Sequence, residues 1–117
     1  MNLEDDLFDL CLGERNPSTT LLNEGAFPGG WVDRYFQLLE QANEQWGNEE
    51  TAPRKAVAAI HFASTYLHVR FGSWRRMNHK DNQVTDNFLA HIRTRGELWL
   101  LGPIVQKVTE HPRRQDL

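Results

Sequence analysis

The chain has 117 residues, of which 39% are hydrophobic and 10% aromatic, and its formal net charge at pH 7 is −3. This length suits one domain with one core, and the composition excludes a disordered chain, in which apolar residues are scarce and the net charge is high. The single cysteine, Cys11, excludes an intramolecular disulfide and a cysteine-based zinc site.

The net charge conceals an asymmetry between the two halves of the chain. Residues 1–50 carry 2 basic and 11 acidic side chains, whereas residues 51–117 carry 11 basic and 5 acidic ones. The resulting balances are −9 and +6. We favour an arrangement in which the halves pack together and neutralise each other, and the alternative is a dipolar surface that steers a partner.

Two features at the ends of the sequence argue against membrane contact. The chain begins Met-Asn-Leu-Glu-Asp-Asp, which has the wrong charge for a signal or transit peptide. Its longest apolar run, Leu98 to Val105, has eight residues and is interrupted by Gly102-Pro103, whereas a membrane helix needs about 20. We therefore expect a cytoplasmic protein.

The first predicted element is a short helix over residues 3–12, which ends at Gly13. Its acidic residues suit the positive end of the helix dipole. Cys11 belongs to the apolar side, so we predict a buried thiol and no nucleophile. Residues 14–30 are typical of a loop pinned to the core, with one short helical turn around residues 19–23. The apolar stripe of the helix consists of Leu3, Leu7, Leu10 and Cys11.

Residues 31–46 show the clearest helical periodicity. Their apolar side chains fall within one arc of a helix, and polar side chains occupy the rest, so we predict a surface helix with one buried face. Gly47 ends it. The predicted buried residues are Trp31, Val32, Tyr35, Leu38, Leu39, Ala42 and Trp46.

The next predicted helix begins near Pro53 and ends between Phe71 and a position just beyond Trp74. It is apolar on two sides, because Phe62 and Val69 project almost opposite its main face, and its several alanines allow close approach of neighbours. We therefore place it at the centre of the fold. Its main apolar face consists of Val57, Ile60, Leu67, Phe71 and Trp74.

A polar connection over residues 72–83 leads to the last predicted helix, in which Val84, Phe88, Ile92 and Trp99 share a face. Arg95 falls on that face, so either Gly96 ends the face or an acid pairs with Arg95, since burying an unpaired guanidinium is too costly. Gly102-Pro103 should interrupt the helix before a last turn or two.

These elements predict an all-α fold class: a compact four-helix, antiparallel, bundle-like domain with three long helices and a short N-terminal one. We expect residues 1–110 to form this single helical domain and residues 111–117 to form a flexible basic tail. Most of the four tryptophans should be core residues.

Two histidines on the predicted central helix are the only hint of a metal or haem site. His61 and His68 are seven residues apart, which is about 10 Å of helical rise, whereas two ligands of one ion normally stand three or four residues apart. No motif for nucleophilic catalysis or nucleotide binding occurs in the sequence. We therefore predict structural histidines, no metal, no cofactor and no catalytic residue.

The strongest local anomaly is the basic and aromatic run over residues 70–80. It holds four fixed positive charges and no acid, and arginine beside tryptophan suits phosphate contacts and base stacking. Basic residues at a helix C-terminus also favour the helix dipole without any partner, and an acidic protein is a further candidate ligand. The candidate binding residues are Arg70, Trp74, Arg75, Arg76, His79 and Lys80, joined by Arg93 and Arg95 if the last two helices are antiparallel.

We predict a non-catalytic helical module for protein–protein interaction or assembly, whose partner is another protein or a second copy. The alternative is a nucleic-acid-binding protein that uses residues 70–80, and a metal- or haem-binding bundle is the second alternative. A fold of this class hosts many activities and does not choose among them.

Overall fold

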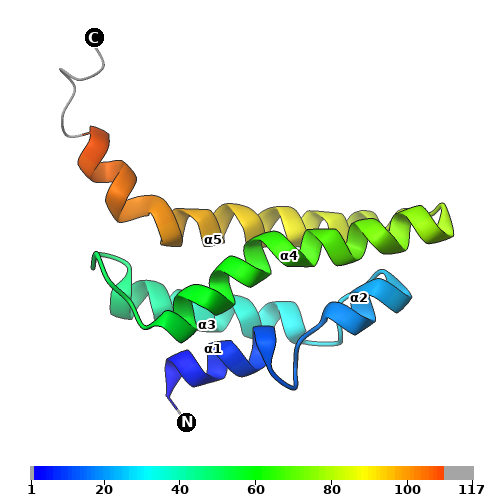
Figure 1. The fold of residues 1–117 in the computed structure, drawn as a ribbon, viewed down its shortest axis with the longest axis horizontal. Coiled ribbons are helices and arrows are strands. Elements are labelled where there is room, and N and C mark those ends of the chain that lie inside the picture. Colours follow the sequence, from blue (N-terminus) through cyan, green and yellow to red (C-terminus); the bar gives the residue numbers. More distant parts are fainter. Residues whose placement is uncertain (1, 110–117) are drawn as a thin grey trace.

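The computed structural model describes residues 2–109, and the side chains of residues 2–102, as an all-α fold (Figure 1). The predicted all-α class is confirmed, and the part of the chain so described contains no strand. The short helical turn predicted around residues 19–23 is a helix of its own, so the described residues contain five helices where four were predicted. The helices are α1 (Leu3–Leu12), α2 (Ser18–Glu24), α3 (Trp31–Trp46), α4 (Arg54–Asn78) and α5 (Gln83–Thr109).

Local chemistry sets the ends of the first helices. The Asn2 side chain accepts a hydrogen bond from the Asp5 N–H at 3.0 Å, which caps α1. Gly13 ends α1 as predicted, by donating its N–H to Phe8 and Asp9 carbonyls. Gly25 ends α2 with φ of 65°, and a Cβ there would overlap the Trp74 ring. Glycine is therefore required at residue 25 for both backbone conformation and space.

The predicted central position of α4 is confirmed, because α4 packs against α1, α2 and α5. Its predicted faces need correction at two residues, since Val57 is 38% exposed and Val69, on the second side, is 56% exposed. Small buried residues such as Ala59 and Ala63 let these neighbours approach closely. In Figure 1, α4 runs diagonally: its first part lies at the level of α3, its later part runs beside α5, and α1 and α2 lie below it. The third helix, α3, packs against α1 and α5.

α4 and α5 form an antiparallel hairpin joined by a short turn. Three cross-contacts fix this direction, because they pair late α4 residues with early α5 residues: Arg75 with Asp86, His68 with the Leu89 carbonyl, and Ser64 with Gly96. A Cβ at Gly96 would overlap Ser64 Oγ. The glycine therefore allows the two backbones to approach at the middle of the hairpin.

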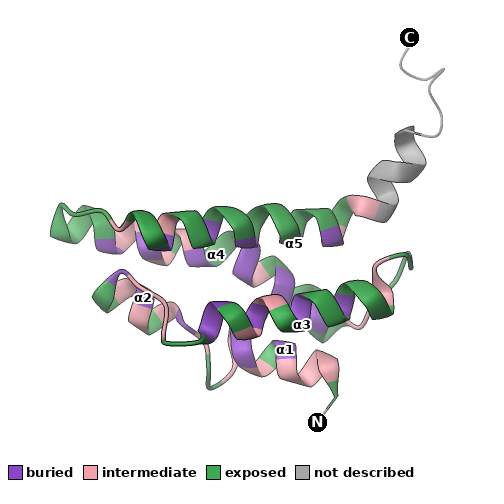
Figure 2. Ribbon diagram, turned by 180° about the vertical axis from the view of Figure 1, so that it is seen from behind, coloured by how far each residue is buried: buried purple, intermediate pink, exposed green. Residues whose placement is uncertain are grey.

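One core connects all five helices (Figure 2). Three of the four tryptophans are buried, and Trp46 is half-buried against the same core, which confirms the predicted role of most of them. The predicted buried faces of α1 and α3 are also confirmed, except that Leu3 and Trp46 are only half-buried. Burial raises the pKa of the Cys11 thiol and of the Tyr35 hydroxyl, so both groups stay neutral.

The hairpin corrects two predictions. The supposed connection over residues 72–83 is mostly helical, because α4 continues to Asn78, and only His79–Asn82 separate the helices. Gly102-Pro103 does not end α5, which runs on to Thr109 and turns away from the other helices near that end (Figure 1). A proline can bend a helix without ending it. The tail expected at 111–117 lies outside the described residues.

The buried face of α5 also differs from the prediction. Val84 and Phe88 are 62% and 38% exposed, and the buried positions are rotated toward their neighbours in sequence. The Thr85 hydroxyl donates a hydrogen bond to the Gly25 carbonyl at 2.8 Å, which fixes the rotation of the helix at its start. The observed face consists of Thr85, Leu89, Ile92, Gly96 and Trp99.

Candidate functional site

The basic run of residues 70–80 forms the last turns of α4 and the start of the hairpin turn. We call the exposed part of it the basic tip: Arg75, Arg76, His79 and Lys80. Three of these residues and Gly72 surround a shallow hollow of about 410 Å³. His79 takes the left-handed conformation, with φ of 52°, that ends the helix. The tip thus gathers positive charge in one place.

Neighbouring groups already engage the arginines of the basic tip. Arg75 lies 3.5 Å from a carboxylate oxygen of Asp81 and 4.0 Å from one of Asp86, and its guanidinium lies over the Phe71 ring. Arg76 donates a hydrogen bond to the Ser73 hydroxyl at 3.2 Å. These contacts lower the positive potential that a phosphate would meet.

Trp74 and Arg70, two of the predicted binding residues, pack against other side chains of the fold. Trp74 is 9% exposed, stacks on Phe71 and is covered by Gly25, so its ring offers no free face for a base. Arg70 lies over the Tyr66 ring, 4.9 Å from the guanidinium carbon to the ring centroid. Its Nε is buried without a hydrogen-bond partner among the described residues.

The structure does not bring Arg93 and Arg95 to the basic tip. They lie 11 and 13 residues beyond Asn82 along α5, which corresponds to roughly 16–20 Å of rise. Arg93 pairs with Glu97 at 3.1 Å. Arg95 is exposed and lies over the Phe36 ring at 4.5 Å. Neither alternative that we considered for Arg95 applies. Arg95 is exposed and not buried in the apolar face, and its guanidinium makes a cation–π contact with α3 instead of pairing with an acid.

The two histidines of α4 differ in burial and in their contacts. His61 is exposed, whereas His68 is half-buried, with its Nε2 3.2 Å from the Leu89 carbonyl oxygen. Burial lowers the pKa of His68, and Arg93 lowers it further, while the Leu89 contact and Asp86 act in the opposite direction. Among the described residues no three histidine, cysteine or carboxylate side chains are grouped so that they could hold a metal ion.

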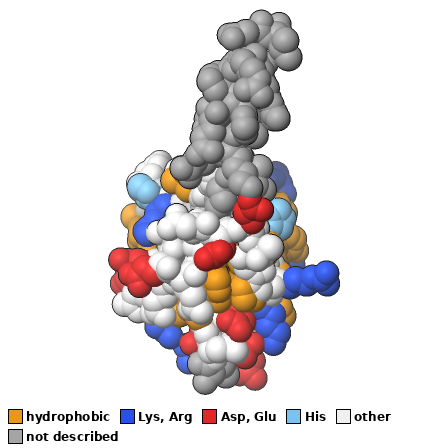
Figure 3. All heavy atoms as spheres, turned by 90° about the vertical axis from the view of Figure 1, so that its left-hand side faces the viewer, with side chains coloured by type: hydrophobic (Ala, Val, Ile, Leu, Met, Phe, Trp, Pro, Cys, Tyr) orange, Lys and Arg blue, Asp and Glu red, His pale blue; other side chains and the backbone are white. Residues whose placement is uncertain are grey.

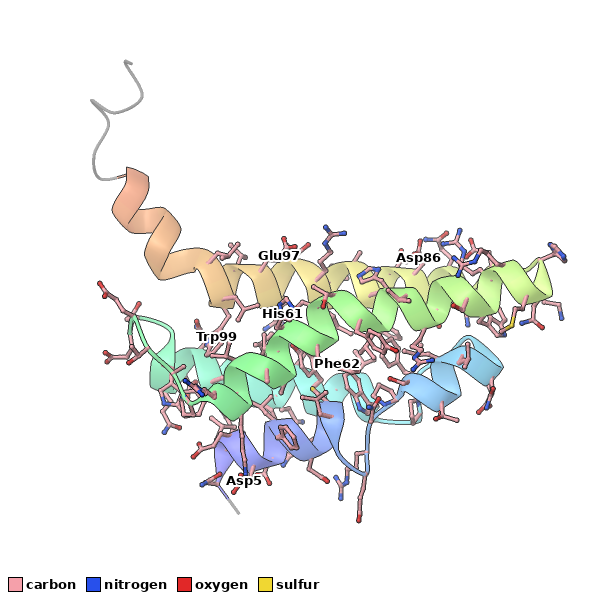
Figure 4. The ribbon with its side chains drawn as sticks, viewed as in Figure 1. Asp5, His61, Phe62, Asp86, Glu97 and Trp99 are labelled. Atoms are coloured by element: carbon pink, nitrogen blue, oxygen red, sulfur yellow. The ribbon has the colours of Figure 1, made fainter. Side chains whose placement is uncertain are left out.

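The other end of the hairpin carries a surface that the sequence analysis did not find. Two hollows of about 410 and 200 Å³ lie on either side of Trp99, the first between α3 and α5 and the second beside the loop that leads into α4. Trp99 points from α5 toward α3 (Figure 4). We call this surface the acidic end, formed by Leu39, Glu40, Asn43, Trp46, Glu49, Glu50, Thr51, Ala52, Val57, Arg95, Leu98, Trp99 and Leu100.

The acidic end combines exposed apolar groups with carboxylates. Leu98 is 67% exposed and Val57 is 38% exposed. Figure 3 views this end of the molecule and shows apolar side chains among acidic ones. Glu40 and Glu49 are exposed, and neither forms an ion pair with a described residue.

One polar atom at the acidic end lacks a partner. Trp99 Nε1 is shielded from solvent and has no acceptor within the part of the chain whose side chains are described. By contrast, Trp31 Nε1 donates to the Leu10 and Arg15 carbonyls at 3.0 and 3.1 Å. Buried donors are nearly always paired. The unpaired indole is therefore a mark of incomplete packing around Trp99.

Sequence reasoning missed the acidic end because its residues come from two stretches that are far apart along the chain, residues 39–57 and 95–100. Glu40 and Trp46 belong to α3, Glu49 to the following loop, and Trp99 to α5. One signal was present, since the excess of acid in residues 1–50 continues through Glu49 and Glu50. It needed the fold to show where that charge meets apolar surface.

Comparisons with known proteins add no name to this site. No protein-family model matches the chain, and no curated protein or solved structure matches it significantly. Within residues 2–109, no helix has the length and apolar character needed to cross a bilayer.

Proposed function

We propose that this chain is a non-catalytic helical interaction module that binds a basic amphipathic segment of a partner at the acidic end. One observation carries the proposal: two hollows share Trp99 and combine exposed apolar side chains with Glu40 and Glu49, which pair with no described cation. In this proposal the four longer helices form an antiparallel bundle-like scaffold that presents the site.

The chemistry of such a partner follows from the surface. An amphipathic helix places apolar anchors three or four residues apart along a groove, and it carries charges beside them. Each leucine-sized anchor that leaves water contributes about 1.5–3 kcal/mol, and the freedom lost on association offsets part of this sum. We therefore expect a dissociation constant in the micromolar range or weaker. Lysine or arginine beside the anchors would meet Glu40 and Glu49, which favours basic over acidic segments.

A calorimetric titration tests this function directly. The probe is an amphipathic helical peptide of leucine and lysine, and a peptide of leucine and glutamate is its control. We expect the lysine peptide to bind, and Glu40→Lys with Glu49→Lys to weaken it by about tenfold or more. The matched variant reverses charge at the opposite end, Arg75→Glu with Arg76→Glu, and should bind at least as well as the unmodified chain.

Two results would count against the function. One is equal binding of the lysine and glutamate peptides, which would mean that the carboxylates play no part. The other is loss of binding in the Arg75→Glu, Arg76→Glu variant while the Glu40→Lys, Glu49→Lys variant binds normally, which would move the site to the basic tip.

A further inference from the structure

The sequence that follows the acidic end has the chemistry that this surface would bind. Leu98 and Leu101, on α5, are 67% and 52% exposed. In the sequence, apolar residues continue this stripe at the spacing that groups them on one side of a helix: Leu101, Ile104, Val105 and Val108. Basic residues accompany them, so residues 103–117 carry Lys107, Arg113 and Arg114 against Glu110 and Asp116, a balance of +1.

The course of α5 carries residues 103–109 away from the acidic end of their own chain. The hollow between α3 and α5 lies alongside Arg95, Leu98 and Trp99. The helix continues beyond them to Thr109 and turns away from the other helices (Figure 1). A continuous helix moves about 1.5 Å further along its axis with each residue and does not reverse onto the turn that precedes it.

We propose that residues 103–117 of one chain occupy the acidic end of a second copy, and that the exchange is reciprocal. The inference rests on the proposed function and names its partner. The apolar stripe of the incoming segment lies over Leu98 and Trp99, and its basic residues lie beside Glu40 and Glu49. Each copy both gives a segment and receives one, so a two-fold symmetric dimer satisfies both sites and leaves neither open for further growth.

The exchange pairs a basic segment with an acidic surface, so reversing the charge of either one should weaken it. Among the described residues that line the two hollows, Glu40 and Glu49 pair with no described cation, and Arg95 is the basic residue. Reversing Glu40 and Glu49 to lysine makes this surface positive. Reversing Lys107, Arg113 and Arg114 to glutamate changes the balance of the segment from +1 to −5. Like charges then oppose each other in either variant alone.

The test is sedimentation velocity of the full chain at concentrations up to about 100 micromolar, which covers a micromolar dissociation constant. We expect the unmodified chain to reach twice the mass of one copy. The surface variant (Glu40→Lys, Glu49→Lys) and the segment variant (Lys107→Glu, Arg113→Glu, Arg114→Glu) should each remain monomeric. An equimolar mixture of the two should form dimers, because each segment then meets a surface of opposite charge.

A matched control and two contrary results complete the experiment. Arg75→Glu with Arg76→Glu, at the basic tip, should dimerise like the unmodified chain, and circular dichroism should show every variant equally helical. A monomeric unmodified chain, or a mixture of the two variants that stays monomeric, overturns the exchange. The leucine and lysine peptide titration then still decides the proposed function, because it needs no second copy.

Discussion

The basic tip and the acidic end lie at opposite ends of the α4–α5 hairpin and differ in how completely their groups are engaged. At the basic tip, Arg75 contacts two carboxylates and the Phe71 ring, and Trp74 is buried between Phe71 and Gly25. At the acidic end, Glu40 pairs with no described cation, Trp99 Nε1 has no acceptor there, and apolar side chains remain exposed.

The comparison shows that a run of basic and aromatic residues in the sequence need not leave those side chains free to bind a ligand on the folded surface. Residues 70–80 attract attention because charge and aromatic groups are adjacent in sequence, yet folding gives several of them internal partners. The acidic end attracts none, because its members are separated by up to 61 positions, from Leu39 to Leu100. An unpaired buried polar atom occurs in both places, Arg70 Nε in the basic run and Trp99 Nε1 at the acidic end, so the exposed apolar groups beside carboxylates are what distinguish the acidic end.

The largest expected effect comes from the middle of α4, on which both ends depend. Ile60 is fully buried, so Ile60→Asp places a charge without a partner in the core and should abolish folding. Val69→Asp, on the same helix at a position 56% exposed, is the matched control and should fold. Circular dichroism and urea denaturation measure both variants. A folded Ile60→Asp chain would show that the two ends do not share this core.

The tryptophans separate the ends directly. Trp74→Ala at the basic tip should lower the free energy of unfolding by about 3–5 kcal/mol, since it removes a buried ring from the core. Trp46→Ala at the acidic end should lower the free energy of unfolding by less, because Trp46 is half-buried. The same variant should bind the leucine and lysine peptide more weakly. Urea denaturation gives the first comparison and calorimetry the second. Equal losses of stability would erase the proposed difference between the ends.

The contact between Ser64 and Gly96 tests how tightly the hairpin closes between its ends. Gly96→Ala should destabilise the fold by about 1–3 kcal/mol, because its Cβ overlaps Ser64 Oγ. Adding Ser64→Ala should restore part of that loss, which a double-mutant cycle measures. Gly72→Ala, also helical but with room for a Cβ, serves as control and should be neutral or stabilising. Additive changes would mean that the helices do not meet at this point.

The smallest expected effect is the pH dependence contributed by His68. Burial lowers its pKa in the fold below the ordinary value of 6.5, so the unfolded chain binds more protons as the pH falls. The stability that His68 contributes is therefore complete above pH 6.5 and is lost as the pH falls through its folded pKa. His68→Gln should show a shallower decline in thermal midpoint below pH 6.5 than the unmodified chain, whereas His61→Gln, at an exposed position, should follow the unmodified chain. Parallel curves for His68→Gln and the unmodified chain would remove this role.

The residues that sequence patterns predicted well are those whose roles are local. The apolar arc of residues 31–46 predicted α3 and its buried face, and Gly13 marked the end of α1. The rotation of α5 could not be predicted in this way, because the Thr85 hydrogen bond to Gly25 joins residues 60 positions apart. The length of α4 was underestimated because Gly72 and the basic residues weaken helical periodicity without ending the helix.

Four indole N–H groups allow one measurement to decide which end binds. Trp46 and Trp99 report on the acidic end, Trp74 reports on the basic tip, and Trp31, held by two carbonyls, reports on the core. A nitrogen-15 NMR titration of the full chain with the leucine and lysine peptide, and separately with a single-stranded oligonucleotide, follows all four. We predict that the peptide shifts the Trp46 and Trp99 indole signals, and that the oligonucleotide shifts none near physiological salt. A peptide that leaves those two signals unmoved, or an oligonucleotide that shifts Trp74, would contradict the assignment of binding to the acidic end.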